Sequence, residues 1–166
     1  GTQHYFPMTI AQEIENVNQF QRLWFINRIN THYGPNVSNK TVGIWGLAFK
    51  PETDDLRCAP SLDVIDNFLS KNTSILAYDP VAAENIATLY PHKINFASRA
   101  KDVLEQADFL VILAEWKEFL TFKPEDFLLL KDKTVFDGRN CFNPQAMADV
   151  GVDYFCVGRN TINKNR

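Results

Sequence analysis

The sequence has no run of basic residues and no long apolar stretch. Its 166 residues include 17 lysines and arginines against 20 aspartates and glutamates, which gives a formal net charge of -3. A nucleic-acid-binding surface needs clustered positive charge, so we exclude that function. No segment approaches the roughly 18 uninterrupted apolar residues of a membrane span, and the N-terminus lacks the pattern of a signal peptide. We therefore expect a cytoplasmic protein that binds neither a membrane nor a nucleic acid.

Residues that form disulfides or hold metals are also scarce. The three cysteines, Cys58, Cys141 and Cys156, are an odd number without a C-x-x-C pair, so we expect reduced thiols that pack as small apolar side chains. The three histidines, His4, His32 and His92, show no ligand spacing. We predict no metal site.

What the sequence does contain is enough apolar surface for a core, with 45% apolar and 13% aromatic residues. Residues 8–32 place apolar side chains at mostly three- and four-residue steps, which predicts one long amphipathic helix that ends before Gly34 and Pro35. The apolar side chains of this helix form more surface than one neighbouring domain can cover, so we expect a second chain or a missing domain to cover the rest. The apolar positions are Ile10, Ile14, Val17, Phe20, Leu23, Trp24, Ile26 and Ile29.

From residue 40 onward, short apolar segments typical of strands alternate with segments typical of helices. Such alternation produces βαβ units and a mostly parallel sheet with helices on both faces. We therefore predict an α/β fold, a Rossmann-like doubly wound sheet preceded by the long N-terminal helix, with a boundary between 1–36 and 37–166. The predicted strands are 41–47, 74–80, 108–116, 134–140 and 152–158, and the predicted helices are 59–71, 81–90, 98–107, 123–131 and 143–151.

Charged segments follow the predicted strands, where open α/β sheets bind their ligands. The segment GLAFKPETDDLR, residues 46–57, contains Lys50 and Arg57, and the segment DGRN contains Arg139. These cations suit a ligand with phosphate groups. Phe49 offers a flat apolar face that either stacks on a base or packs against the helix. Two further segments, YDP with Asp79 and AEW with Glu115, complete the set of strand ends.

Each of these charges also has a purely structural interpretation. In that interpretation Lys50 is a solvated loop lysine, and the charged residues of 54–57 favour the helix dipole or pair locally. Arg139 then pairs with Asp137.

A glycine-rich dinucleotide fingerprint is missing from the first strand end. The segment VGIWGLAF contains Gly43 and Gly46 but no G-x-G-x-x-G. The domain is therefore a poor candidate for holding a nicotinamide cofactor by itself.

The segments VGIWGLAFKPETDDLRCAPSLDVI, AYDP, ADFLVILAEWKEF and VFDGRN, in this order and at these distances, resemble the C-terminal domain of the UDP-glucose/GDP-mannose dehydrogenase family. The segment IENVNQFQRLWFINRI resembles the end of the long central helix that leads into that domain. The resemblance extends over roughly residues 5–158. It implies that 1–36 is the end of the connecting and dimerisation helix and that 37–166 is the UDP-sugar-binding domain.

Members of that family oxidise the C6 alcohol of a nucleotide-sugar to a carboxylate in two NAD-dependent steps, through a catalytic cysteine. The resemblance implies that Phe49, Lys50 and Arg139 contact the UDP-sugar and that Arg57 reaches NAD, the cofactor of the full-length enzyme. It also implies that the aspartates at 54 and 55 hold the loop and orient the cations rather than act as acid or base.

Two parts of the family pattern are absent: a G-x-G-x-x-G domain and a G-F-G-G-x-C-x-x-K-D-like segment that supplies the nucleophile. We therefore expect an inactive fragment without catalytic residues. Its expected partners are a UDP-sugar, the missing NAD-binding and central domains, and a second copy in a homodimer. We expect UDP-glucose as the substrate, oxidised to a uronate for surface polysaccharide. The alternatives are a UDP-N-acetyl-hexosamine or GDP-mannose dehydrogenase, or a stand-alone nucleotide-sugar-binding module.

Overall fold

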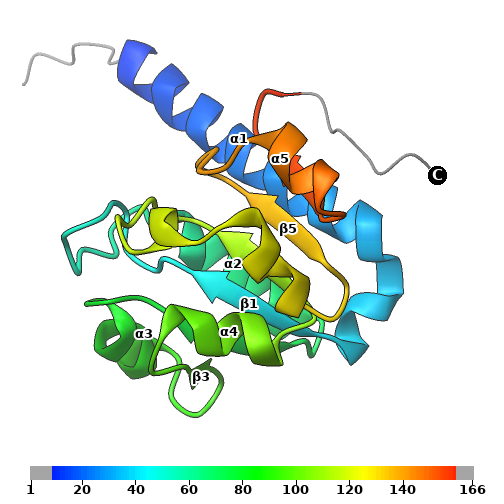
Figure 1. The fold of residues 1–166 in the computed structure, drawn as a ribbon. Helices are drawn as coiled ribbons and strands as arrows, with labels where there is room; N and C mark the ends of the chain where they lie inside the picture. Colours follow the sequence, from blue (N-terminus) through cyan, green and yellow to red (C-terminus); the bar gives the residue numbers. More distant parts are fainter. Residues whose placement is uncertain (1–8, 160–166) are drawn as a thin grey trace, which may run out of the picture.

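The structure, a computed structural model, describes residues 9–159 and contains one six-stranded sheet (Figure 1). The strand order is β3-β2-β1-β4-β5-β6 and each neighbouring pair is parallel, which is the order of dinucleotide-binding Rossmann sheets. The predicted fold class is confirmed. The strands are β1 (Thr41–Trp45), β2 (Ser74–Tyr78), β3 (Asn95–Phe96), β4 (Phe109–Ile112), β5 (Thr134–Asp137) and β6 (Asp153–Cys156).

The helices follow the predicted segments, and the structure also has one strand and two 3-10 segments that the sequence did not predict. Strand β3 is only two residues long and was not predicted, because so short a segment carries no periodicity. The segment predicted as a helix at 123–131 forms a 3-10 helix over Pro124–Leu129, and its start is fixed by the Lys123 N–H, which donates to the Asp126 carboxylate at 2.7 Å. The helices are α1 (Thr9–Tyr33), α2 (Pro60–Ser70), α3 (Ala83–Leu89), α4 (Ala100–Gln106) and α5 (Pro144–Asp149), with 3-10 segments η1 (Gly34–Asn39), η2 (Phe119–Thr121) and η3 (Pro124–Leu129).

A separate hydrophobic core lies on each face of the sheet. One core joins the sheet to α1, α2 and α3, and the other joins it to α4, η3 and α5. Alternation along β1 directs Val42 and Ile44 into the first core and Trp45 into the second. This two-sided burial explains why the central strands read as continuous apolar runs.

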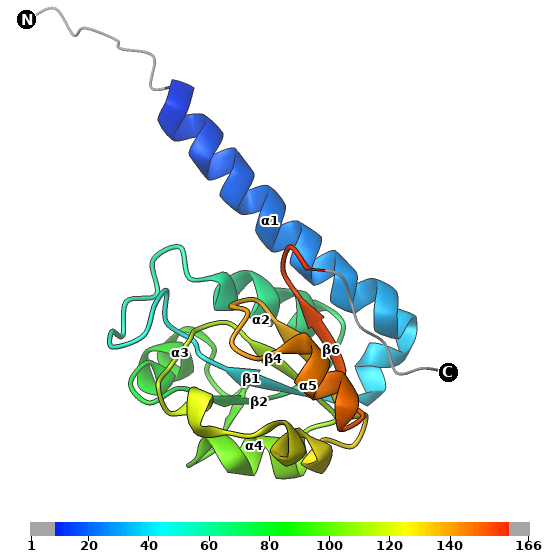
Figure 2. The ribbon, with the colours of Figure 1, turned by 45° about the horizontal axis from the view of Figure 1, so that its top comes forward.

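Helix α1 is attached to the domain along only part of its length (Figure 2). Its C-terminal half buries Phe25, Ile26 and Ile29, and Arg28 Nη1 donates to the Cys156 carbonyl at 2.8 Å. The expectation that the domain covers only part of this helix is confirmed, although the predicted first residue, Met8, lies outside the described residues. The N-terminal half projects outward. The exposed apolar residues of α1 are Ile10, Ile14, Val17 and Phe20 in this half, and Leu23 and Trp24 just after it. Within residues 9–159, no helix combines the length and apolar character that crossing a membrane requires.

Gly46 allows β1 and β4 to approach closely where the first loop begins. Its φ is +86°, and a Cβ at this position would lie 2.6 Å from both the backbone N and the Cβ of Ala114. Its N–H also donates to the Tyr78 carbonyl at 3.0 Å. A residue without a side chain is therefore required at this point of the fold.

We expect Gly46→Ala to lower the free energy of unfolding by roughly 2 to 5 kcal/mol, because the new methyl group overpacks the strand junction in a left-handed backbone conformation. Gly34→Ala is the matched control, since Gly34 also has a positive φ, +57°, but no atom within 4 Å of the added Cβ. Chemical denaturation compares the two. Equal losses of stability would contradict the close approach at Gly46.

Candidate functional site

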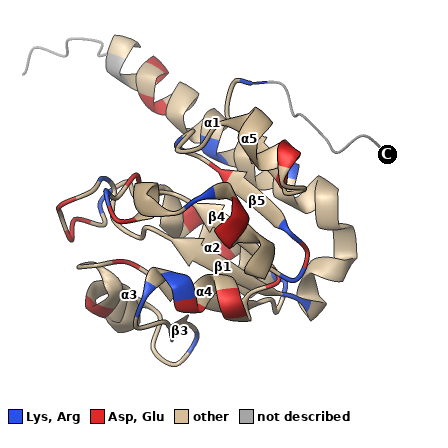
Figure 3. Cartoon of the chain, viewed as in Figure 1, with Lys and Arg blue, Asp and Glu red and all other residues tan. Residues whose placement is uncertain are grey.

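Four loops meet at the carboxyl ends of the central strands. The parallel register pairs Trp45 with Tyr78 and with Ile112, and pairs Ile112 with Asp137, so these four strands end side by side. The loops that follow are the four segments singled out in the sequence. Figure 3 shows both positive and negative residues along the β1–α2 loop, in contrast to the largely uncharged strands.

Asp79, at the end of β2, is buried and bound by the protein itself. It is 4% exposed, and its carboxylate accepts N–H groups from the β1–α2 loop, from the turn before α3 and from Trp116. In a dinucleotide-binding sheet, an acidic residue in the second part of the βαβ unit binds the ribose hydroxyls of the cofactor. The Asp79 carboxylate is already occupied by N–H groups of the protein, so it is not available to ribose hydroxyls. This agrees with the absence of the glycine fingerprint.

Asp137, at the end of β5, fixes the turn that carries Arg139. The buried carboxylate accepts the Tyr154 hydroxyl at 2.6 Å, the Arg139 N–H at 2.7 Å and the Cys141 N–H at 2.8 Å. Burial raises the pKa of Asp137, and these hydrogen bonds to the charged form oppose the rise. The turn is therefore held by one carboxylate that faces inward rather than toward a ligand.

The Arg139 side chain joins three strand ends. Its Nε donates to the Leu113 carbonyl after β4 at 2.7 Å, and its Nη2 donates to the Phe49 carbonyl in the β1–α2 loop at 3.1 Å. The alternative that Arg139 forms an ion pair with Asp137 is wrong, because only the backbone N–H of Arg139 contacts that carboxylate. A guanidinium group has five N–H donors, so three remain for a ligand.

Phe49 and Lys50 present free surface beside Arg139. The Phe49 N–H donates to the Asp55 carbonyl at 2.9 Å, and its side chain is 47% exposed. Lys50 is exposed and makes no hydrogen bond or ion pair within residues 9–159. The structure thus brings together the three residues expected at the UDP-sugar, because Arg139 contacts the Phe49 carbonyl and Lys50 follows Phe49 in the chain.

Arg57 lies on a different part of the same loop. Its Nε and Nη2 donate to the Asp55 carboxylate at 3.0 and 2.7 Å, while the Arg57 side chain stays 89% exposed. The hydrogen bonds from Arg57 lower the pKa of Asp55 to about 2. The interpretation of local pairing is confirmed for these two residues, and the pair orients the guanidinium group.

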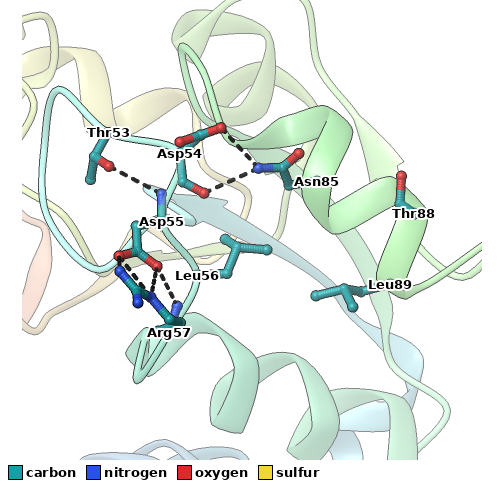
Figure 4. A pocket seen from close by; sticks show the side chains of 8 residues that line it. All are labelled: Thr53, Asp54, Asp55, Leu56, Arg57, Asn85, Thr88 and Leu89. Carbon is teal, nitrogen blue, oxygen red and sulfur yellow. Dashed lines mark hydrogen bonds and ion pairs between the residues drawn. The ribbon is translucent and has the colours of Figure 1, made fainter.

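A cleft of about 640 Å³ separates this part of the loop from α3 (Figure 4). Asp54 holds its rim, because Asn85 Nδ2 donates to both the carbonyl and the carboxylate of Asp54 at 3.2 Å. The lining residues are Thr53, Asp54, Asp55, Leu56, Arg57, Asn85, Thr88 and Leu89, and they do not include Phe49, Lys50 or Arg139.

A second cleft of about 580 Å³ lies between the β1–α2 loop and the segment after β4. Glu52 and Lys117 pair across it at 3.2 Å, and Trp116 forms part of its wall. The sequence had drawn attention to Glu115 in this segment, but the residue that connects it to the rest of the site is Trp116. The signal in the sequence was the tryptophan itself, because an indole N–H usually finds a hydrogen-bond acceptor when the ring is partly buried.

Two of the cysteines, Cys141 and Cys156, lack the lowered pKa of an activated nucleophile. All three are free thiols, and burial raises the pKa of Cys141 to about 12 and also raises that of Cys156. Both thiols therefore stay protonated near neutral pH.

No metal-binding group stands out either. Among the residues that the structure describes, no group of three His, Cys, Asp or Glu side chains could hold a metal ion. His4 lies outside them, and His32 packs against the rings of Tyr33, Phe136 and Phe155.

Comparisons of the sequence with known proteins show one family. A model of the "UDP-glucose/GDP-mannose dehydrogenase family, UDP binding domain" matches residues 43–144. The UDP-glucose 6-dehydrogenase of Pseudomonas aeruginosa is 33% identical over 166 residues, which cover 95% of this chain and 36% of that protein.

Solved structures share the fold. A UDP-glucose dehydrogenase from Pyrobaculum islandicum superposes with a TM-score of 0.73 at 22% identity, covering 89% of this chain and 32% of the other. An NDP-N-acetyl-D-galactosaminuronic acid dehydrogenase from Methanosarcina mazei gives the same TM-score at 21% identity, covering 96% and 34%. The chain spans about a third of the length of the relatives that it matches.

Proposed function

The chain belongs to the UDP-glucose/GDP-mannose dehydrogenase family, and we propose that it is the C-terminal, UDP-sugar-binding part of an NAD-dependent UDP-glucose 6-dehydrogenase. Residues 37–166 form the binding domain in this proposal, and residues 1–36 are the end of the helix that connects it to the central domain. The chain contributes substrate binding rather than redox chemistry. The oxidation of C6, with transfer of two hydrides to two NAD, takes place in the longer enzyme.

The observation that carries the proposal is the contact of Arg139 with the Phe49 carbonyl. It brings the cations of two loops, Lys50 and Arg139, to one edge of the sheet. A diphosphate fits this pair, because a guanidinium group with three free N–H donors and an exposed ammonium group offer charge-assisted hydrogen bonds. The half-exposed ring of Phe49 offers an apolar surface to the base or the sugar.

UDP-glucose is the substrate that the named relatives favour. The Pseudomonas aeruginosa relative is a UDP-glucose 6-dehydrogenase, while one neighbour of equal TM-score is named for an N-acetylated sugar. The fold is thus compatible with either sugar, and the proposal of glucose rests on sequence similarity.

We expect the chain to bind UDP more tightly than GDP in calorimetric titrations at low salt. Lys50→Ala and Arg139→Ala should each weaken UDP binding by roughly 1 to 3 kcal/mol, the scale of a charge-assisted hydrogen bond. Lys93→Ala is the control, because Lys93 is also exposed but lines a pocket beside the start of β2. Unchanged UDP affinity in both variants, with titration curves like those of Lys93→Ala, would overturn the assignment.

We also propose that Arg57 contacts NAD in the full-length enzyme. Arg57 is highly exposed, its orientation is set by Asp55, and it lines a cleft that does not contain Lys50 or Arg139. These features suit a cation that reaches a phosphate group on a molecule other than the nucleotide-sugar.

Arg57→Ala in the full-length dehydrogenase should raise the KM for NAD by about tenfold or more, because one charge-assisted hydrogen bond is lost, and should leave the KM for UDP-glucose almost unchanged. Arg99→Ala is a matched control, since Arg99 is also exposed and pairs with a nearby carboxylate, Asp102. Steady-state kinetics with each substrate varied measures both constants. An unaltered NAD dependence would remove this role from Arg57.

The exposed apolar residues of α1 indicate further binding partners. We propose that its apolar residues pack against the central domain and against the same helix of a second copy, so that the enzyme is a homodimer. Six large apolar side chains exposed along one helix, as on this one, are costly to leave in water.

In sedimentation equilibrium, the chain should therefore self-associate through α1. The double variant Ile14→Glu, Phe20→Glu should be monomeric at concentrations where the parent is dimeric, because each buried apolar side chain contributes about 1.5 to 3 kcal/mol. Leu129→Glu, which alters an exposed leucine on η3, is the control and should leave the association unchanged. A parent chain that stays monomeric would contradict pairing of α1 with itself.

A further inference from the structure

We infer that Asp79 is a positioning residue, which holds the loops of the nucleotide-sugar site in their binding arrangement without touching the ligand. The inference rests on the proposed function, because it assigns a role within the same site. Asp79 is only 4% exposed, so any effect on the ligand passes through the groups that the carboxylate binds.

The Oδ2 atom of Asp79 fixes the start of the β1–α2 loop and the segment after β4. It accepts the Leu47 N–H at 2.7 Å, the Ala48 N–H at 3.4 Å and the Trp116 indole N–H at 3.2 Å. One oxygen atom therefore joins the segments that leave β1 and β4, and Ala48 is only two residues before Lys50.

The Oδ1 atom of Asp79 fixes the turn that leads into α3. It accepts the backbone N–H groups of Val81 at 2.9 Å and Ala82 at 2.8 Å. Helix α3 forms the far wall of the cleft that contains Arg57. The same side chain thus sets the distance between the loop and α3.

The loop residues directly before Lys50 are held by several hydrogen bonds. Before it, the Leu47 N–H binds Asp79 and the Leu47 carbonyl accepts the Ser61 hydroxyl. After Ala48, the Phe49 carbonyl accepts Arg139 and the Phe49 N–H binds the Asp55 carbonyl. Loss of the Asp79 contacts would leave Ser61, Arg139 and Asp55 as the attachments described here.

The chemistry of the five donors requires a carboxylate at this position. All five groups are N–H donors, and a carboxylate is an acceptor on both oxygens. An asparagine of the same shape has one oxygen and one NH2 group. Its NH2 group would face N–H donors of the protein and could not accept their hydrogen bonds. Asp79→Asn should therefore release either the turn before α3 or the β1–α2 loop together with Trp116.

The test compares Asp79→Asn with Asp108→Asn by NMR and by calorimetric titration with UDP. Asp108 is the matched control, because it also accepts a backbone N–H, that of Thr41 at 2.6 Å, but does so at the start of β1. We expect Asp79→Asn to retain the sheet, to shift the Trp116 indole N–H resonance, and to speed amide exchange at residues 47–50 or 81–82. UDP affinity should fall roughly tenfold, the effect of losing one hydrogen bond to a charged group. Asp108→Asn should change neither the Trp116 signal nor UDP affinity.

The outcomes separate the inference from the proposed function. A parent chain and full-length enzyme that do not bind UDP overturn the proposed function, and amide exchange without ligand then decides whether Asp79 holds the loops. Parent-like exchange in Asp79→Asn, or altered exchange with parent-like UDP affinity, overturns the inference. If Asp79→Asn does not fold, Trp116→Phe removes one donor alone and should weaken UDP binding by a smaller factor, and no change in that variant would also count against the inference.

Discussion

The binding edge of this domain depends on hydrogen bonds that two buried carboxylates accept from loop N–H groups. Asp79 and Asp137 lie at the ends of β2 and β5, and each binds donors from segments that follow the strands. A buried carboxylate is costly unless its oxygens are paired, and these N–H groups also need acceptors away from water. The N–H groups pair the carboxylate oxygens, and the carboxylates give the N–H groups their acceptors, so loops that lack regular structure acquire fixed positions.

This arrangement explains how a sheet with the dinucleotide-binding strand order serves another ligand. In the dinucleotide site, a glycine-rich turn brings backbone N–H groups to the pyrophosphate. Here the first loop is longer and carries side-chain cations, while its backbone is bonded to Asp79 and to Arg139. In the proposed function, recognition therefore moves from the backbone to the side chains of Lys50 and Arg139, whose positions depend on how the loop is held.

The sequence predicted most of the fold, because the period of apolar residues determines elements longer than about five residues. It also predicted that Lys50, Arg57 and Arg139 lie at strand ends, since parallel strands end at one edge. The pairing of Arg57 with Asp55 is local and followed from spacing. The partners of Arg139 did not, because Leu113 and Phe49 lie 26 and 90 residues away and are backbone carbonyls, which any residue supplies. For the same reason, the five donors around Asp79 were invisible before the strands were placed side by side.

The docked half of α1 touches the turn that carries Arg139. The Phe25 ring lies 3.6 Å from where a Cβ on Gly138 would stand, and Arg28 binds the carbonyl at the end of β6. A helix is stiff over this length, and its other half extends away from the domain (Figure 2). The surface that anchors the helix and the turn that carries Arg139 are therefore neighbours, so the orientation of α1 on the domain and the position of that turn depend on the same packed side chain, Phe25.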